Sequence, residues 1–304
     1  MKKMRIVGLG EVLWDLLPGG ASLGGAPANF AYIAGLLGSE GIVASRVGED
    51  SLGRDALERM RELGLGTDYV QVDSGHPTGT VNIEIDAEGQ ARFEIAHPVA
   101  WDFLELTPAW RQLANETDAV CFGSLAQRSP RSRATIQSFI DAVSADAIKV
   151  FDVNLRQSYY SQEILGDSMK RADIVKVNNQ ELPKIMKLHG LPHKNERWSA
   201  EALLAKFNLK LVCVTRGADG SLLVQQDDID EHPGFRVKVA DTVGAGDAFT
   251  AALLHEYLHG SPLKSMNEMA NRVGAWVASK PGGMPVAAGG LHDISAEFTQ
   301  SETS

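Results

Sequence analysis

Short apolar runs rich in valine and isoleucine alternate along this chain with segments in which apolar residues recur at helical spacing. The runs are bounded by glycine or polar residues, and they lie at 4–10, 41–48, 118–124, 148–154, 173–179 and 210–217. Their separation leaves room for intervening helices, which is typical of βαβ units around a buried parallel sheet. We therefore expect an α/β fold with a doubly wound, mostly parallel sheet flanked by helices.

The segment TVNIEIDAEGQARFEIA (80–96) follows a different pattern. Apolar Val81, Ile83 and Ile85 alternate with polar residues, DAEG supplies a turn, and the alternation then resumes. A period of two with one apolar face predicts an antiparallel hairpin, which does not belong in a parallel core. We expect a small antiparallel β lid from about 11–23 and 70–98, within one domain spanning 1–304. The lid would cover the site, form a homodimer surface or do both, and an edge hairpin on the main sheet is the alternative.

The composition is that of a soluble globular protein, with 44% hydrophobic and 22% charged residues. A net charge of −10 and the lack of a Lys/Arg-rich run argue against nucleic-acid binding. Cys121 and Cys213 lie in apolar runs, which favours buried thiols over a disulfide framework. Glu11 and Asp15 interrupt the first apolar run, so it fits neither a signal peptide nor a membrane span. We expect a cytoplasmic protein without membrane association.

Polar residues follow many of the predicted strands. They are Glu11, Asp50, Asp152, Asn154, Asn178, Thr215 and Arg216. In an open α/β sheet, ligands bind at the carboxyl ends of the strands. These side chains therefore mark the edge of the sheet where a site is expected.

The stretch DTVGAGDAFT (241–250) places small residues directly before a predicted helix. A helix N-terminus exposes unpaired N–H groups, and small residues let an anion approach them closely. Asp247 would stand beside that anion and accept a proton from an attacking hydroxyl, or it would only cap the helix. No G-x-x-x-x-G-K-[ST] loop is present, and GLGEVLW lacks the third glycine of a dinucleotide fingerprint.

Five motifs in order resemble those of the ribokinase-like (PfkB) carbohydrate kinases and cover nearly the whole chain. They are LGGAPANFA (23–31), RVGEDSLG (46–53), VNNQE (177–181), VTRGADG (214–220) and DTVGAGDAF (241–249). Within the family, GEVLWDLLP, VAWDF and FDVNLR are most similar to the bacterial fructokinases. The resemblance implies that Asp247 is the catalytic base. It also implies that the N–H groups of Gly244, Ala245 and Gly246 hold the charge that develops on the transferred phosphoryl group.

The same resemblance assigns the remaining site residues. The sugar-binding positions are Asp15, Gly24, Gly25, Asn29 and Arg156. The alternatives are a satisfied buried amide for Asn29 and a surface salt bridge for Arg156. The nucleotide positions are Asn178, Thr215, Gly217 and Asn271. Glu181, with Asn178, would organise Mg²⁺ through water, and the alternative for Glu181 is a solvated first-turn residue. The carbonyls of Asp241 and Val243, with the loop 279–283, correspond to a K⁺ site in some relatives.

One departure concerns the sugar, because some relatives carry an acid where this chain has Gln127 and Arg128. We expect an ATP- and Mg²⁺-dependent kinase that converts D-fructose to fructose 6-phosphate. The alternatives are another PfkB kinase, acting on 2-keto-3-deoxygluconate, ribose, a nucleoside or a sugar phosphate, an NAD(P)-dependent oxidoreductase, and a non-catalytic sugar sensor. HEYLH (255–259) matches the H-E-x-x-H zinc pattern, but the helix ends at once and no third ligand is evident.

Overall fold

The computed structural model describes residues 3–17, 19–85 and 91–287. Within them, nine strands form the main sheet in the order β13-β12-β11-β10-β9-β8-β1-β4-β5. The strands are β1 (Arg5–Leu9), β4 (Glu40–Gly48), β5 (Val70–Asp73), β8 (Ala119–Gly123), β9 (Ile148–Asp152), β10 (Ile174–Asn178), β11 (Leu211–Thr215), β12 (Ser221–Val224) and β13 (Ile229–His232). All neighbouring pairs from β5 to β11 are parallel, and β12 and β13 are antiparallel additions at one edge. The predicted doubly wound, mostly parallel sheet is confirmed.

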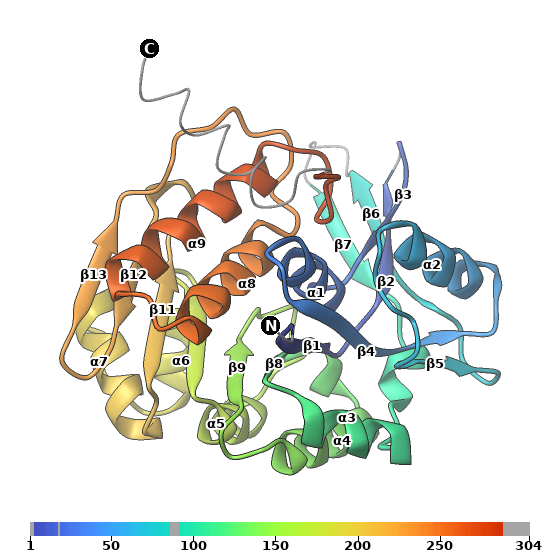
Figure 1. Ribbon diagram of the computed structural model, residues 1–304, viewed down its shortest axis with the longest axis horizontal. Helices are drawn as coiled ribbons and strands as arrows, with labels where there is room; N and C mark the ends of the chain where they lie inside the picture. Colours follow the sequence, from blue (N-terminus) through green and yellow to red (C-terminus); the bar gives the residue numbers. More distant parts are fainter. Residues whose placement is uncertain (1–2, 18, 86–90, 288–304) are drawn as a thin grey trace.

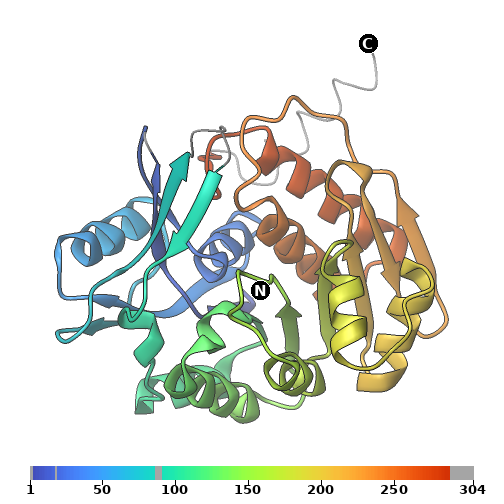
Figure 2. The same ribbon diagram turned by 180° about the vertical axis from the view of Figure 1, so that it is seen from behind.

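Helices cover both faces of this sheet. They are α1 (Ala26–Leu36), α2 (Ser51–Glu62), α3 (Pro108–Glu116), α4 (Pro130–Ala142), α5 (Gln162–Arg171), α6 (Leu182–Leu188), α7 (Glu196–Phe207), α8 (Ala245–Leu258) and α9 (Leu263–Ala278). Figure 1 views the face that carries α1, α8 and α9, and Figure 2 shows α3 to α7 on the other face. The described residues also include three short 3₁₀ turns: η1 (Ala100–Phe103), η2 (Leu125–Arg128) and η3 (Gly217–Asp219).

The core consists of two apolar clusters, one on each side of the sheet. Consecutive strand residues alternate between them, so that Ile174 packs under α1, α8 and α9 while Val175 packs under α3 to α7. Cys121 and Cys213 belong to the first cluster as free, buried thiols, which confirms the interpretation of these two residues. Among the described residues, no helix is both long and apolar enough to cross a bilayer.

The hairpin predicted at 80–96 belongs to a separate four-stranded sheet, so the alternative of an edge hairpin on the main sheet is wrong. Its strands are β2 (Leu13–Leu17), β3 (Gly20–Gly24), β6 (Gly79–Ile85) and β7 (Ala91–Ile95), in the order β3-β2-β6-β7. The outer pairs are antiparallel, but β2 and β6 run parallel. The small sheet lies beside the carboxyl ends of the main strands (Figure 1).

The expected lid boundary at residue 70 is wrong. Val70–Asp73 forms β5, which pairs in parallel with β4 at the edge of the main sheet. Its alternation of apolar and polar residues is that of an edge strand, which the sequence pattern does not distinguish from a lid strand. The expected turn at 86–89 lies outside the described residues, apart from its flanking strands.

Candidate active site

The first turn of α8 has the geometry of an anion site. Gly244 is its N-cap, with φ 75° and ψ −7°, a left-handed conformation that favours glycine. A Cβ atom at Gly244 would lie 2.4 Å from the α carbon of Gly283, so a side chain does not fit there. The N–H of Ala245 approaches the carbonyl of Thr242 at 3.3 Å. The N–H groups of Gly246 and Asp247 have no helical acceptor, because they lie in the first turn.

Asp247 is tied to another helix. Its Oδ2 accepts a hydrogen bond of 2.8 Å from Nδ2 of Asn29, which lies in α1. Burial is the main cause that raises the pKa of Asp247 to about 6, and the nearby carboxylate of Asp152 adds to the shift. The hydrogen bond from Asn29 and the charges of Lys176 and Arg156 oppose it. A carboxyl group with this pKa is ionised at neutral pH and still basic enough to accept a proton.

A buried polar network supports this turn from below. Nζ of Lys176 in β10 lies 3.1 and 3.0 Å from the two carboxylate oxygens of Asp152 in β9. Oγ1 of Thr250 in α8 donates to Asp152 and to the carbonyl of Gly246, both at 2.9 Å. A Cβ at Gly246 would lie 3.0 Å from Nζ of Lys176, so glycine lets the turn sit directly on the ammonium group.

Lys176 remains charged in this environment. Burial lowers its pKa, but the carboxylates of Asp152, Glu181 and Asp247 outweigh burial, so the pKa is raised. A buried cation therefore lies beneath the N-terminal turn of α8. Its positive charge adds to the partial positive charge at that end of the helix dipole.

The predicted sugar-binding residues Asp15, Gly24 and Gly25 lie on the strands and the turn that lead into α1, the helix whose Asn29 binds Asp247. Asp15 lies on β2, Gly24 ends β3, and Gly25 is the N-cap of α1 with φ 108°. A Cβ at Gly24 would lie 2.6 Å from Oδ2 of Asp15, and a Cβ at Gly25 would lie 2.5 Å from the carbonyl oxygen of Glu11. Glycine is therefore required at position 25, where the backbone blocks a side chain, whereas a side chain at position 24 would displace the Asp15 carboxylate. Burial raises the pKa of Asp15 to about 6, although the charge of Arg156 opposes it.

Arg156 follows β9, and its positive charge acts on nearby carboxyl groups. Its Nη1 donates to the carbonyl of Leu155 at 3.3 Å, and it forms no ion pair within the described ranges. Burial raises the pKa values of Glu11, Asp15 and Asp247, and the charge of Arg156 opposes this rise. The alternative of a surface salt bridge finds no partner among the described residues.

Asn178 and Glu181 form a rigid turn between β10 and α6. Oδ1 of Asn178 accepts from the backbone N–H groups of Gln180 and Glu181, at 3.0 and 2.9 Å. The Glu181 carboxylate accepts from the N–H of Leu155 at 2.7 Å and from that of Asn178 at 2.9 Å. Glu181 is only 5% exposed, so the alternative of a solvated first-turn residue is wrong.

This turn fits Mg²⁺ held through water. Mg²⁺ usually takes one or two carboxylates together with phosphate oxygens and several waters. Each oxygen of Glu181 keeps a lone pair beyond its backbone hydrogen bond. Among the described residues no cluster of three or more His, Cys, Asp or Glu side chains could hold a metal ion, so HEYLH (255–259) gains no third ligand there.

The remaining nucleotide positions lie along the same edge. Thr215 ends β11, and Gly217 follows in η3 with φ 61°. Asn271 on α9 is buried, and its Nδ2 donates to Oγ of Ser221 at 2.7 Å and to the carbonyl of Asn267 at 2.8 Å. Its amide nitrogen is therefore held inside the protein, and its expected position beside adenine stays a prediction.

The side chain of Asp241 joins two loops of the expected cation site. Its Oδ1 accepts from the N–H of Val243 at 3.0 Å, and its Oδ2 accepts from that of Gly282 at 3.1 Å. The loop 279–283 thereby packs against 241–243. A Cβ at Gly283 would lie 2.7 Å from Oδ1 of Asn29, so this loop also touches α1.

The comparison with protein families decides the class of enzyme. The family model described as "pfkB family carbohydrate kinase" matches residues 20–287. The chain belongs to this family. It is a phosphotransferase that acts on a sugar hydroxyl, as the sequence motifs predicted, and the oxidoreductase alternative is wrong.

Relatives within the family share most of the chain. The fructokinase of Escherichia coli is 32% identical over 81% of this chain and 82% of its own. The sugar kinase PH1459 of Pyrococcus horikoshii in complex with ATP matches with a TM-score of 0.79 at 28% identity, over 92% of this chain and 94% of its own. A double mutant of the fructokinase of Vibrio cholerae, with fructose, ADP and potassium ion bound, has a TM-score of 0.80 at 25% identity, over 97% and 98%.

In this family member, the sequence motifs assigned no role to some residues that the fold brings to this edge. Asp152 and Thr250 lie in segments that the sequence had singled out. Lys176, which supports the first turn of α8 together with them, is signalled only as a single cation inside the apolar strand IVKVN. Glu11 and Arg128 are buried at the same edge of the sheet. Arg128 pairs with Asp102 across 26 residues of chain, a contact that spacing does not reveal.

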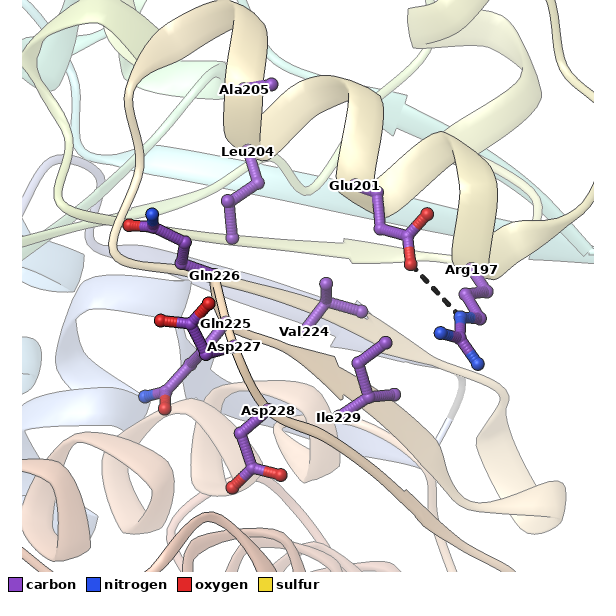
Figure 3. Close-up of a pocket in the computed structure, with 10 residues that line it drawn as sticks. All are labelled: Arg197, Glu201, Leu204, Ala205, Val224, Gln225, Gln226, Asp227, Asp228 and Ile229. Atoms are coloured by element: carbon purple, nitrogen blue, oxygen red, sulfur yellow. Dashed lines mark hydrogen bonds and ion pairs between the residues drawn. The ribbon is translucent and has the colours of Figure 1, made fainter.

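A separate groove lies far from these residues. It is formed by α7 and the turn between β12 and β13, with Arg197 and Glu201 paired at 3.0 Å (Figure 3). Val224 in this groove pairs with Val212, near the amino end of β11, whereas the site lies beyond the carboxyl end at Thr215. The groove contains no residue of the kinase motifs.

Proposed function

We propose that this protein transfers the γ-phosphoryl group of ATP to the 6-hydroxyl of D-fructose. The observation that carries the proposal is the position of Asp247 in the first turn of α8, joined to Asn29 at 2.8 Å. One carboxylate thus stands between a helix N-terminus that suits phosphate and a group of residues that suits sugar hydroxyls. The ATP, ADP and fructose bound to family relatives support this choice of substrates.

The residues assign each step of the transfer. Asp247 accepts the proton of the sugar hydroxyl as that oxygen forms its bond to the γ-phosphorus, and the bond to the β–γ bridging oxygen breaks to release ADP. The N–H groups from Gly244 to Gly246 and the positive end of α8 stabilise the charge on the phosphoryl oxygens. Mg²⁺ neutralises phosphate charge when bound, and Glu181 would hold it through water.

Fructose is the proposed acceptor because relatives named fructokinase match over most of the chain. Another kinase of this family, acting on 2-keto-3-deoxygluconate, ribose, a nucleoside or a sugar phosphate, is the competing proposal. A K⁺ ion at the carbonyls of Asp241 and Val243, a homodimer through the small sheet and a cytoplasmic location are also part of the proposal. The junction of 241–243 with the loop 279–283 supports the K⁺ site.

The test is ADP formation with a panel of these sugars, with and without Mg²⁺. We expect Mg²⁺-dependent ADP release with D-fructose and a product identified as fructose 6-phosphate. In Asp247→Asn, we expect kcat to fall on the order of 10²-fold or more, because the hydroxyl proton loses its acceptor. The exposed Asp55→Asn on α2, outside the kinase motifs, is the matched control and should keep wild-type kcat.

If another sugar gave ADP faster than fructose, that sugar would be the substrate, and the assigned reaction would be unchanged. Sugar binding without ADP release by the wild type would favour the sugar sensor. Asp247→Asn with wild-type kcat would show that the base is wrongly assigned.

A further inference from the structure

Two strongly buried charged side chains flank the point where the strand order reverses. β1 lies between β4 and β8, and the chain winds outward from it in both directions. Glu11 follows β1, and Arg128 ends η2 directly after β8. In open α/β sheets, the crevice at such a reversal is the usual place for a ligand. Neither residue has a role in the kinase mechanism above.

Arg128 is held rigidly but keeps one nitrogen without a partner. Its Nε and Nη2 donate to Asp102 at 2.8 and 2.9 Å, and Nη2 also donates to the carbonyl of Ala96 at 2.5 Å. The guanidinium lies 3.9 Å from the ring of Trp101 and 4.7 Å from that of Tyr159. Its Nη1 is buried and has no hydrogen-bond partner within the described chain.

Glu11 has a buried acceptor atom without a partner, as Arg128 has a buried donor atom without one. The residue is 4% exposed, and its Oε2 has no hydrogen-bond partner within the described residues. Arg128, Arg156 and Asp247 all act on it electrostatically, yet it forms no ion pair in the described part of the chain. Burial raises its pKa to about 7. The carboxyl group accepts a hydrogen bond from its own backbone N–H, but a buried oxygen left without a partner still costs free energy, so a fold that keeps one needs a reason.

These atoms adjoin the proposed sugar site. The carbonyl of Glu11 touches Gly25, the residue before α1, and Asn29 of α1 binds Asp247. Oδ1 of Asn29 is itself buried without a hydrogen-bond partner among the described residues. Glu11 and Asn29 therefore supply two buried acceptors, and Arg128, whose charge acts on Glu11, supplies one buried donor. A sugar hydroxyl both donates and accepts hydrogen bonds, so hydroxyl groups match this set.

We propose that Glu11 and Arg128 are additional sugar-binding residues that select a neutral polyhydroxy substrate over a sugar acid. Oε2 of Glu11 accepts from one hydroxyl, and Nη1 of Arg128 donates to a hydroxyl oxygen. A carboxylate on the substrate would face the acids Glu11, Asp15 and Asp247, while the charge of Arg128 is already paired with Asp102. The charge of Arg156 opposes this selection, because it would favour a sugar acid. The inference rests on the proposed sugar kinase function.

The test compares Glu11→Leu and Glu11→Gln with the wild type. Because a hydrogen bond to a charged group contributes about 1.5–3 kcal/mol, we expect the KM for D-fructose to rise on the order of 10-fold or more in Glu11→Leu. The rise should be smaller in Glu11→Gln, which keeps an acceptor oxygen. The KM for ATP should stay within about twofold of wild type, since the ATP phosphates bind at α8. The exposed Glu58→Gln on α2 is the matched control and should leave both values unchanged.

Stability separates binding from a structural role. Glu11 forms no ion pair among the described residues and has one buried oxygen without a partner, so its replacement by an apolar side chain should leave the thermal midpoint unchanged or raised. A lowered midpoint with changes in both KM values would overturn the proposal, as would an unchanged KM for D-fructose in both variants. The wild type should also discriminate against 2-keto-3-deoxygluconate, and Glu11→Leu should discriminate less. Equal use of the sugar acid by the wild type would overturn the choice of substrate class.

Calorimetric binding of D-fructose distinguishes this inference from the kinase proposal. If the wild type binds fructose, Glu11→Leu should bind it on the order of 10-fold more weakly whether or not ADP is formed. If no sugar gave ADP but Glu11→Leu bound fructose more weakly, the proposed reaction would be wrong and the sugar-binding role of Glu11 would stand. Equal binding by the wild type and the variant would overturn the role.

Discussion

The two ends of the active site treat their buried polar groups in opposite ways. Beneath the N-terminal turn of α8, Lys176 and Thr250 both donate to the Asp152 carboxylate, with every contact between 2.9 and 3.1 Å. On the sugar side, Glu11, Asn29 and Arg128 each keep a buried atom without a partner among the described residues. Satisfied networks rigidify a structure, whereas unsatisfied groups cost stability. The phosphoryl end is therefore built for fixed geometry, and the sugar end keeps its hydrogen-bonding capacity for a ligand.

Breaking the ion pair between Lys176 and Asp152, at the phosphoryl end, should have the largest effect on stability. Lys176→Met leaves the carboxylate of Asp152 buried without its cation, which costs about 3–5 kcal/mol. Urea unfolding measures this loss. The double variant Lys176→Met/Asp152→Asn should recover part of it, because the uncompensated charge is gone. The exposed Lys184→Met should stay within about 0.5 kcal/mol of wild type, and an equally small loss in Lys176→Met would contradict the comparison.

The pH dependence of activity should report the acids that link the two ends. The base must be ionised, and the raised pKa of Asp247, about 6, means that its proton is held to a higher pH than in an ordinary aspartate. We expect kcat/KM to be constant above that pKa and to fall about tenfold for each pH unit below it. Asp15 and Glu11 titrate nearby, so the observed value belongs to the group of acids. An acidic limb near pH 4 would contradict the burial of Asp247.

Gly24 offers a smaller perturbation at the sugar end. A Cβ at this position would lie 2.6 Å from Oδ2 of Asp15, so Gly24→Ala must displace that carboxylate. Losing one hydrogen bond of about 0.5–1.5 kcal/mol would raise the KM for the sugar several-fold and leave the KM for ATP unchanged. Gly35→Ala is the matched control, because a Cβ there meets nothing within 4 Å. Unchanged kinetics in Gly24→Ala would show that Asp15 does not bind the sugar.

Local patterns were sufficient for most of the fold. The apolar runs located β1, β4 and β8 to β11, because buried parallel strands are nearly continuous in valine and isoleucine. The lid boundary failed because β5 is a short edge strand whose partner, β4, is chosen by tertiary pairing.

The site divides in the same way. The motif at 241–250 located Asp247 and the helix N-terminus, since glycine and small residues have a local meaning there. The bond between Asn29 and Asp247 joins residues 218 apart in the chain, and neither side chain signals its partner. Lys176, Glu11 and Arg128 are defined by burial and by missing or distant partners, which exist only in the folded chain.

The most direct test is a crystal structure with D-fructose and a non-hydrolysable ATP analogue. We expect the γ-phosphate against the N–H groups from Gly244 to Gly246, and the 6-hydroxyl within hydrogen-bonding distance of the Asp247 carboxylate. A triphosphate bound elsewhere, with the mouth of α8 filled by the protein's own atoms, would contradict it.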